Sequence, residues 1–400
     1  MTSIRGHALL AILLAVLAIP TLLGAPATAS ATAGSYQIPA CNYAPEGANN
    51  SWVWSSTDTS QPQHYAEHTN CPDRLGGTGG TRDQEGGLST TDALELHNGA
   101  PSGTSAGWTF TAPPNTTITG ITYERYIGHE LDPFNDWSPA LRADGTIIPG
   151  ETCLDTVQND DTCFIGGPPG HGGEPSTITG LSAHELTVGI DCEAPSGQEC
   201  ITGATLHSVW AAMYGATVTL ADPTLSTLNQ PTGTLWQPGT ANGYHHGTET
   251  VTTSANDIGG GVQSITLAAD EKPIETYNAT CDFTHNQPCP TSTDPQTLTL
   301  PTSQLPDGPH TLTLYATNAA NNKSTIATEH INIDNNPPTP PTELTATPTQ
   351  PGGSTYIATW NDPDQDTPIT QATYQLCPVS SIGSCTTPTS APPTGPATIA

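Results

Sequence analysis

The sequence predicts an all-β protein built from consecutive sandwich domains, and three observations lead to this prediction. Gly and Pro occur 39 times each, so few stretches are long enough for a helix without a breaking residue. Only 11% of the residues are charged, which leaves few of the Lys, Arg and Glu side chains that favour helices. Short runs alternate apolar and polar residues between turn residues, as in residues 117–123, and this pattern is typical of strands.

The first 33 residues carry the three parts of a secretory signal peptide. Arg5 supplies the positive charge, residues 8–23 form an apolar run that contains Pro20, and small residues at 27–33 fit a cleavage site. The apolar run is short for a membrane span of about 20 residues, so we favour a cleaved signal over a retained anchor. No later segment is apolar enough to cross a bilayer, and we expect a protein that is secreted or associated with the cell surface.

Ten cysteines behind such a signal indicate disulfide bonds. Zinc binding by thiolates is the less favoured alternative, because the sequence has no Cys-x-x-Cys and export disfavours free thiols. The sequence does not fix the connectivity, and pairing between nearest neighbours is the simplest hypothesis. Loops this short would each stabilise the fold by about 2–3 kcal/mol. The pairs would be Cys41 with Cys71, Cys153 with Cys163, Cys192 with Cys200, Cys281 with Cys289, and Cys377 with Cys385.

Turn signals divide the rest of the chain into three units. Residues 34–220 contain many short strand-like runs, which predict a jelly-roll-like double sheet. Residues 221–335 show shorter runs with regularly spaced turns and predict an immunoglobulin-like sandwich. Residues 336–341 form a Pro-rich linker that is semi-rigid. Residues 342–400 contain too few strand runs to close a sandwich, so we interpret this unit as incomplete as given.

Within the first unit, two alternating runs flank a turn. Residues 108–111 and 117–123 alternate apolar and polar side chains, and Ala-Pro-Pro-Asn stands between them at 112–115. A turn between two such runs predicts a hairpin. We therefore expect these two strands to pair with each other.

Residues 221–335 resemble the bacterial immunoglobulin-like domains of secreted and surface proteins. Those domains often carry Asp-x-Gly-x-Gly-Val, a Val-Asp-Gly-x-Pro turn, a Leu-x-Asp-Gly-x-His-x-Leu strand, Asp-x-Ala-Gly-Asn, and an Asp-Asn-x-x-Pro exit. Glu271 and Asn321 stand where the family has glycines, so two turns are expected to depart from the family pattern. The counterparts in this chain are residues 257–262, 270–273, 305–312, 318–322 and 334–338.

The other two units have weaker resemblances. Residues 342–400 resemble the start of a fibronectin type III domain, with Trp360 on its second strand and Tyr374 on its third. Residues 34–220 look like the leading domain of actinobacterial extracellular proteins with the same layout. These resemblances imply a fold and are nearly silent on function.

The charge balance excludes several kinds of partner. The chain has 37 acidic and 7 basic residues, with a net charge of −30 at pH 7. Nucleic acid binding needs Lys and Arg to neutralise phosphates, and an anionic lipid surface is disfavoured for the same reason. Solubility is the simplest role of the charge, and cation binding by acidic loops is the alternative.

Calcium is the second metal ion, after zinc, that the sequence brings into consideration. Asp155, Asp160 and Asp161 lie in the loop between Cys153 and Cys163. Calcium takes six to eight oxygen ligands, but these residues lack the Asp-x-Asp-x-Asp-Gly order of a common calcium loop. We therefore favour a solvated loop and expect no metal and no cofactor.

Two groups of residues are candidates for ligand binding. Trp52 and Trp54 alternate with Val53 and share one strand face, so they would form a carbohydrate platform if exposed and part of the core if buried. The second group combines carboxylates with an imidazole and an indole, which suits a sugar or a cation; its simpler interpretation is a polar loop anchored by its aromatic residues. It consists of Glu124, His129, Glu130, Asp132, Asp136 and Trp137.

The sequence favours a non-catalytic protein. It contains no Gly-x-Ser-x-Gly, no His-Glu-x-x-His and no phosphate-binding glycine loop. We expect adhesion or binding to a carbohydrate or cell-wall polymer through residues 34–220, with spacer domains behind them. One alternative is a purely structural surface stalk. Another is a glycoside hydrolase that uses two carboxylates near Glu124–Asp136. The ligand and the oligomeric state are not predicted.

Overall fold

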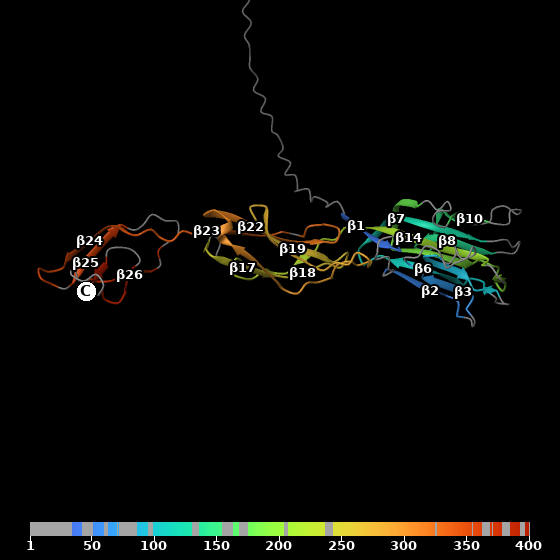
Figure 1. Ribbon diagram of the computed structural model, residues 1–400, viewed down its shortest axis with the longest axis horizontal. Coiled ribbons are helices and arrows are strands. Elements are labelled where there is room, and N and C mark those ends of the chain that lie inside the picture. The colour runs from blue at the N-terminus through green and yellow to red at the C-terminus, as the bar shows by residue number, and fades with distance from the viewer. Residues whose placement is uncertain are drawn as a thin grey trace, which may run out of the picture. The chain divides into compact units, whose positions relative to one another are not determined.

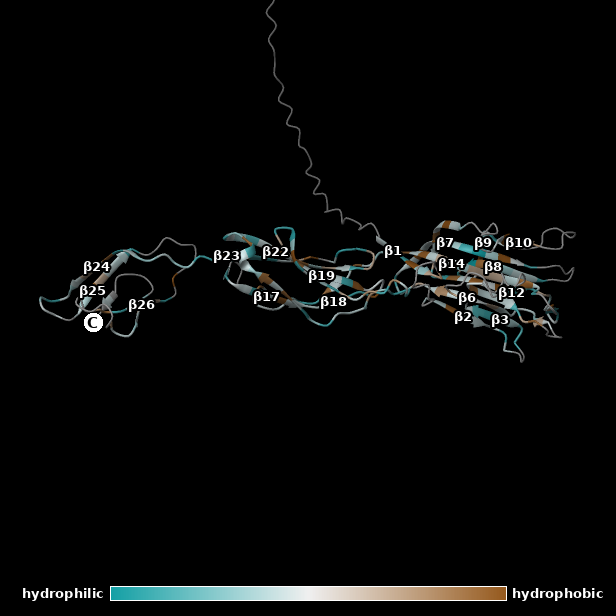
Figure 2. Ribbon diagram, in the orientation of Figure 1, coloured by the Kyte–Doolittle hydropathy of each residue, from teal (hydrophilic) through white to brown (hydrophobic). Residues whose placement is uncertain are grey.

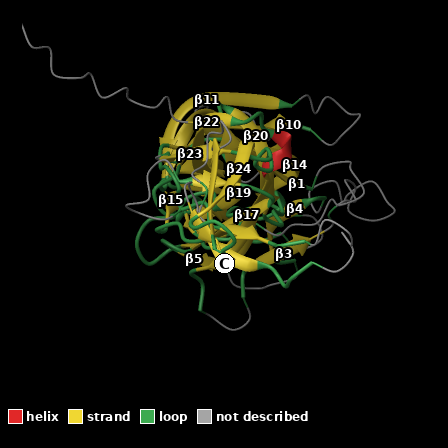
Figure 3. Cartoon of the chain, turned by 90° about the vertical axis from the view of Figure 1, so that its left-hand side faces the viewer, coloured by secondary structure: helices red, strands yellow, loops and turns green. Residues whose placement is uncertain are grey.

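The computed structural model consists almost entirely of strands and loops (Figure 3). It divides the chain into two units, Met1–Thr32 and Ala33–Ala400. All residues that the structure describes belong to the second unit. They are residues 34–41, 51–59, 63–69, 71, 86–94, 99–129, 136–153, 163–167, 175–203, 207–236, 243–324, 326–353, 355–361, 369, 371–377, 385–392 and 397–399.

The first large sheet has seven strands, and its two longest strands, β7 and β14, pair with each other in antiparallel fashion. The order is β10-β7-β14-β4-β3, with β11 on the edge of β7 and β1 on the edge of β14. Figure 1 labels β1, β3, β7, β10 and β14 of this sheet. Their bounds are β1 Gly34–Ala40, β3 Tyr65–Thr69, β4 Leu88–Asp92, β7 Thr117–His129, β10 Cys163–Gly166, β11 Ser176–Ala183 and β14 Val209–Asp222.

A second sheet of five strands, in the order β2-β6-β12-β8-β9, faces the first. The cluster of buried apolar residues draws on both sheets, with Phe110 and Val188 from the second and Ile127 and Val218 from the first. The ribbon colour changes between hydrophobic and hydrophilic along these strands (Figure 2), as two packed sheets require. The bounds are β2 Trp52–Ser56, β6 Ser105–Thr111, β8 Trp137–Ala143, β9 Thr146–Thr152 and β12 Glu185–Cys192, and β5 Ala100–Pro101 pairs with β13 Glu199–Cys200.

The predicted hairpin in this region is wrong. The two runs are strands, β6 and β7, but β6 pairs with β2 and β12, whereas β7 pairs with β10, β11 and β14. The turn between them carries the chain from one sheet to the other. Both strands have an apolar face because both line the same core, and alternation alone does not distinguish this arrangement from direct pairing.

Residues 227–333 form further sheets with an apolar core of their own, which contains Ile265, Leu267, Leu298 and Leu314. One sheet has the order β16-β23-β22-β19-β20, and β17 pairs with β21. The bounds are β15 Thr227–Leu228, β16 Tyr244–His245, β17 Thr248–Thr253, β18 Ala255–Asn256, β19 Val262–Ala269, β20 Lys272–Asn278, β21 Gln296–Pro301, η2 Thr302–Gln304, β22 Gly308–Asn318 and β23 Ala327–Ile333.

Two turns in this region hold non-glycine residues in the left-handed conformation. Asp270 and Glu271 connect β19 to β20 with φ of 48° and 68°, and Asn321 follows β22 with φ of 60°. Positive φ at both central residues is the type I′ hairpin turn, which favours Asn-Gly or Asp-Gly. Glu271 and Asn321 thus take a backbone conformation that favours glycine, although neither is glycine.

Residues 342–399 contain two small sheets, β24-β25-β28 and β26-β27. The strands β24, β25 and β26 overlap the few strand-like runs that the sequence shows in this unit. The strands β27 and β28 were not predicted, because each is three residues long and lies in a stretch rich in Thr and Pro without clear alternation. The bounds are β24 Thr342–Pro348, β25 Tyr356–Asn361, β26 Ala372–Tyr374, β27 Thr389–Ala391 and β28 Ala397–Ile399.

Five disulfide bonds join the ten cysteines as nearest neighbours, which confirms the simplest pairing scheme. Within the residues that the structure describes, no helix is long and apolar enough to span a membrane.

Candidate functional site

The outer face of the seven-stranded sheet carries a group of aromatic side chains on three neighbouring strands. Phe164 on β10 lies opposite Gly128 on β7, which lies opposite Trp210 on β14. Tyr126 is two residues before Gly128 and therefore projects from the same face of β7. We call Phe164, Tyr126 and Trp210 the aromatic face.

The three rings contact one another in sequence. The ring centroids of Phe164 and Tyr126 are 6.0 Å apart at an interplanar angle of 69°, and those of Tyr126 and Trp210 are 5.1 Å apart at 46°. Edge-to-face and tilted pairs at such separations contribute about 0.5–1.5 kcal/mol each beyond the area they bury. Phe164 is 58% exposed and Trp210 only 1%, so the group runs from solvent into a buried position.

Gly128 allows the rings to come this close. A Cβ atom at Gly128 would lie 2.8 Å from both the Cβ of Phe164 and the Cζ2 of Trp210, and 2.6 Å from the carbonyl oxygen of Cys163. Such distances are shorter than real Cβ atoms show. The absence of a side chain at Gly128 is therefore a condition for the aromatic face.

Polar groups lie on the same face beside the rings. Ser89 on β4 and Tyr126 on β7 lie in one row across the sheet, because both pair with Ala212 on β14, the strand between them. Among the described residues, the indole Nε1 of Trp210 and the hydroxyl of Ser89 are buried and have no hydrogen-bond partner. Glu124 precedes Tyr126 by two residues and adds a half-buried carboxylate to this face.

The inner face of β7 holds a buried ion pair that the sequence analysis did not predict. The guanidinium of Arg125 lies 2.5 Å from the carboxylate of Glu151. The hydroxyl of Tyr123 donates to the same carboxylate at 2.6 Å, and the hydroxyl of Ser176 donates to it at 2.9 Å. Burial, and then the negative charge of Glu151, raise the pKa of Tyr123 well above its usual range. The carboxylate of Glu151 therefore has its ion-pair and hydrogen-bond partners within the protein.

The structure does not bring the described residues of the predicted carboxylate, imidazole and indole cluster together at one site. Glu124 projects from the outer face of β7, and His129, which alternates with it, projects inward. Asp136 and Trp137 lie at the start of β8, in the other sheet. Glu130 and Asp132 lie outside the described residues, as do the calcium candidates Asp155, Asp160 and Asp161.

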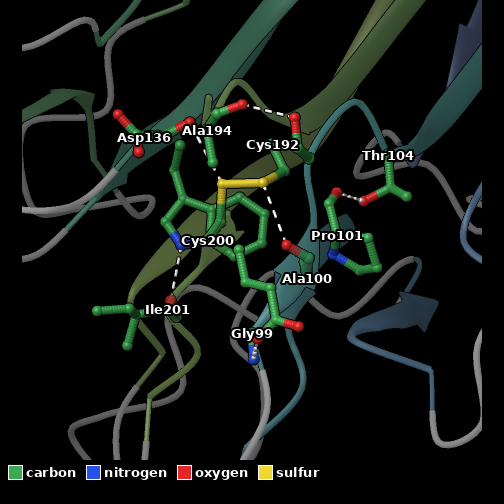
Figure 4. The surroundings of a disulfide bond; sticks show 12 residues. Gly99, Ala100, Pro101, Thr104, Asp136, Cys192, Ala194, Cys200 and Ile201 are labelled. Atoms are coloured by element: carbon green, nitrogen blue, oxygen red, sulfur yellow. Dashed lines mark hydrogen bonds between the residues drawn. A yellow bond between two sulfur atoms is a disulfide. The ribbon is translucent and has the colours of Figure 1, made fainter. Parts of the chain in front are cut away.

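Asp136 lies beside the Cys192–Cys200 disulfide (Figure 4), and Trp137 follows it as the first residue of β8. The indole Nε1 of Trp137 donates to the carbonyl of Ile201 at 2.8 Å. The backbone carbonyl of Asp136 accepts a hydrogen bond from the amide of Glu193 at 2.8 Å. Trp137 is buried, so its place in this loop is that of a packing anchor.

The exposed carbohydrate platform considered for Trp52 and Trp54 is not formed. Trp52 is 3% exposed and packs against Phe110, with ring centroids 5.6 Å apart. Trp54 is half-buried, and its Nε1 donates to the hydroxyl of Thr90 at 3.2 Å across the two sheets. The pair faces the core because that is the side of β2 on which the seven-stranded sheet packs.

Phe164, Tyr126 and Trp210 were not among the predicted site residues. Phe164 follows Cys163 directly, and Tyr126 stands two residues after Glu124 on the same face of β7. Both therefore lie close in the chain to residues that the sequence pattern did indicate. What brings the three rings together is the order of β10, β7 and β14 in the sheet, and this order joins residues that are far apart in the sequence. Local alternation does not contain that information.

Comparison with known proteins identifies no family. No protein-family model and no curated protein matches the chain. Similarity to solved structures is weak. An endo-β-1,4-mannanase from Thermotoga petrophila is 11% identical with a TM-score of 0.18, over 27% of this chain and 20% of that one. The fibronectin(III)-like modules of Clostridium thermocellum CbhA are 11% identical with a TM-score of 0.22, over 61% and 94%.

A third similar structure is the glycoside hydrolase domain of Endo-D from Streptococcus pneumoniae R6. It is 8% identical with a TM-score of 0.18, over 70% of this chain and 37% of that one. The chain thus spans only 20% of the mannanase and 37% of the Endo-D domain. Likenesses this weak carry no functional inference.

Proposed function

We propose that this protein is an extracellular, non-catalytic binding protein that holds a carbohydrate or cell-wall polymer on the aromatic face of its first double sheet. The observation that carries the proposal is the exposed ring of Phe164, which continues through Tyr126 to a buried indole whose Nε1 has no partner among the described residues.

This combination suits a sugar. The C–H surfaces of a pyranose ring pack against aromatic side chains, and its hydroxyl groups both donate and accept hydrogen bonds. A binding site commonly joins an apolar surface with a few placed polar groups. The half-buried carboxylate of Glu124, on the same face of β7, would supply such a group.

The charge of the chain narrows the class of polymer. With a net charge of −30, the protein repels anionic polymers at long range. Glu124 places a further carboxylate on the binding face. A neutral or cationic polysaccharide therefore fits the proposal better than a polyanion.

A binding role is favoured over hydrolysis by the arrangement of the described carboxylates. A glycosidase needs two carboxyl groups about 5–9 Å apart across one sugar. Glu124 lies on an outer sheet face, Asp136 starts a strand of the other sheet, and Glu151 is engaged by Arg125.

The remaining units would act as spacers. In this proposal, residues 221–335 are a bacterial immunoglobulin-like domain and residues 342–400 are a fibronectin type III-like unit. Together they hold the binding face away from a cell surface or a neighbouring domain. The disulfides fit an oxidising exterior.

A pull-down with the whole chain tests the proposal. Cellulose, chitin and purified cell-wall sacculi are incubated with the wild type and with Phe164→Leu, which keeps an exposed apolar side chain but lacks the ring. We expect retention on at least one polymer and a loss of about 2–10-fold in affinity for the variant, as the loss of one aromatic contact predicts. Absence of retention on all three polymers would contradict the proposal and favour a purely structural stalk.

A further inference from the structure

The Cys153–Cys163 disulfide has a feature that sets it apart from the other described cysteine pairs. The imidazole of His129 lies beside it, and one nitrogen of His129 and the two sulfur atoms all lie within 4.8 Å of one another. Cys163 lies directly opposite His129 in the ladder between β10 and β7. His129 and Cys153 are buried, and Cys163 is half-buried.

Two thiolates and one imidazole are ligands that a zinc ion prefers. Zinc takes four ligands in a tetrahedron, with Zn–S near 2.3 Å and Zn–N near 2.0 Å, so neighbouring ligand atoms are about 3.5–4 Å apart. In the disulfide the two sulfur atoms are at bonding distance, and a nitrogen of His129 lies within 4.8 Å of them. Loss of the S–S bond lets the sulfur atoms move apart by about 1.5–2 Å to the spacing of zinc ligands, and water would supply the fourth ligand.

We propose that reduction of the Cys153–Cys163 disulfide converts it, together with His129, into a binding site for a single zinc ion. The step needs a dithiol reductant. The S–S bond takes two electrons and two protons from the dithiol, which becomes a cyclic disulfide, and two thiols result. Zinc then binds both sulfur atoms as thiolates and the neutral imidazole, and two protons are released to solvent.

The site has a structural consequence for the aromatic face. Cys153 follows β9 of the five-stranded sheet, and Cys163 begins β10, the four-residue strand that carries Phe164. The disulfide therefore ties the edge of one sheet to the edge of the other. A zinc ion at the same three atoms would keep this connection when the covalent bond is lost, and so keep Phe164 in place. The zinc site itself does not depend on this effect on Phe164 or on the proposed polymer binding.

Other cysteine pairs provide an internal comparison. In the part of the chain that the structure describes, His129, Cys153 and Cys163 are the one group of three or more His, Cys, Asp or Glu residues placed to hold a metal ion. Cys192 and Cys200 form a disulfide of similar loop length, with no histidine in the loop and no third ligand in such a group. Reduction of that pair yields two thiols without an imidazole, which gives a weaker site.

The test is a cobalt titration, because Co²⁺ replaces Zn²⁺ in thiolate sites and absorbs light through its bonds to sulfur. The whole chain is reduced with dithiothreitol, desalted without oxygen and titrated with Co²⁺ and then with Zn²⁺. We expect one tight Co²⁺ per chain with a thiolate-to-cobalt absorption band, displacement by Zn²⁺, and no binding to the oxidised protein.

Matched variants identify the ligands. Replacement of Cys192 and Cys200 by Ser should leave the tight site intact, as should replacement of Cys281 and Cys289, whose loop contains His285. Replacement of Cys153 and Cys163 by Ser should abolish the tight site. His129→Gln keeps all ten cysteines and should weaken Co²⁺ binding at least tenfold after reduction. The proposal is overturned if the reduced wild type binds no Co²⁺ tightly, or if the tight site survives His129→Gln unchanged.

Discussion

The two large double-sheet regions differ in what they bury. The sheets of residues 34–222 enclose the Arg125–Glu151 ion pair and His129 in addition to their apolar core. The apolar core of residues 227–333 consists mainly of Leu, Ile, Val and Ala side chains, and Asp257 and His310 are buried outside it. Burial of charged groups costs free energy unless they are paired. The first region buries its ion pair between its two sheets, in the same double sheet that carries the aromatic face.

The largest expected effect comes from a substitution that breaks the Arg125–Glu151 ion pair in the first region. Glu151→Ala leaves Arg125 without its carboxylate and removes the acceptor of Tyr123 and Ser176, so we expect a loss of about 3–5 kcal/mol in the free energy of unfolding. Urea unfolding followed by tryptophan fluorescence measures it. The exposed Glu185 of the same region gives the control, because Glu185→Ala should change the free energy by less than about 0.5 kcal/mol.

A double variant sharpens this prediction. Replacement of Arg125 by Met and Glu151 by Leu removes both charges and leaves no unpaired ion, so it should recover most of the loss. Equal losses for Glu151→Ala and the double variant would mean that packing, and not the unpaired charge, controls stability here.

The second region should respond to the loss of apolar volume. Leu267 is fully buried in its core, and Leu267→Ala should cost about 3 kcal/mol through lost burial and the cavity that remains. Because no charge is involved, the loss should be the same at low and at high salt. A strong salt dependence in the same urea experiment would contradict the comparison between the two cores.

How far the sequence predicts the structure also differs between the regions. The strand runs and turns of residues 221–335 were predicted closely, because each turn there carries its own residue signature. In the first region the strands were found but the pairing of β6 with β7 was wrong, and the tryptophans at 52 and 54 face the core. Pairing between distant strands decides both points, and local alternation does not encode it.

The candidate site illustrates the same limit. Glu124 was predicted from the sequence as a site residue, and it lies on the outer face of β7 beside the aromatic face. Phe164 and Trp210 were missed, because they meet only when β10 and β14 pair with β7 on either side of Gly128. Disulfide connectivity, in contrast, was predicted correctly, since short loops leave few ways to join neighbouring cysteines.

A smaller effect is expected at two hairpin turns of equal geometry. Asp144-Gly145 in the first region and Asp270-Glu271 in the second both have positive φ at both positions. A non-glycine residue in the left-handed conformation costs roughly 1 kcal/mol, so Glu271→Gly should stabilise the protein by about 1 kcal/mol and Gly145→Ala should destabilise it by a similar amount. Thermal unfolding measures both, and a loss of stability in Glu271→Gly would contradict the assignment.

The smallest effect concerns pH and the pair of His310 with Asp270. Burial of His310 lowers its pKa, but the hydrogen bonds to the Asp270 carboxylate at 2.6 Å and to the carbonyl of Pro306 at 2.7 Å outweigh it, so the pKa of His310 is raised above 6.5. A raised histidine pKa stabilises the fold below pH 6.5, and the stabilisation is lost as the pH rises through the folded value. The melting temperature should therefore fall slightly above neutral pH in the wild type and change less in His310→Gln.

Binding to a polysaccharide by matched single-residue variants tests the central claim most directly. Phe164 and Val53 are both exposed apolar side chains, at 58% and 68%, but Phe164 belongs to the aromatic face and Val53 lies on the other sheet. The depletion isotherm of the whole chain is measured on whichever of cellulose, chitin or cell-wall sacculi retains the wild type. We predict that Phe164→Ala weakens binding at least tenfold, as loss of one stacked ring implies, while Val53→Ala binds like the wild type. Equal binding by both variants and the wild type would contradict the account.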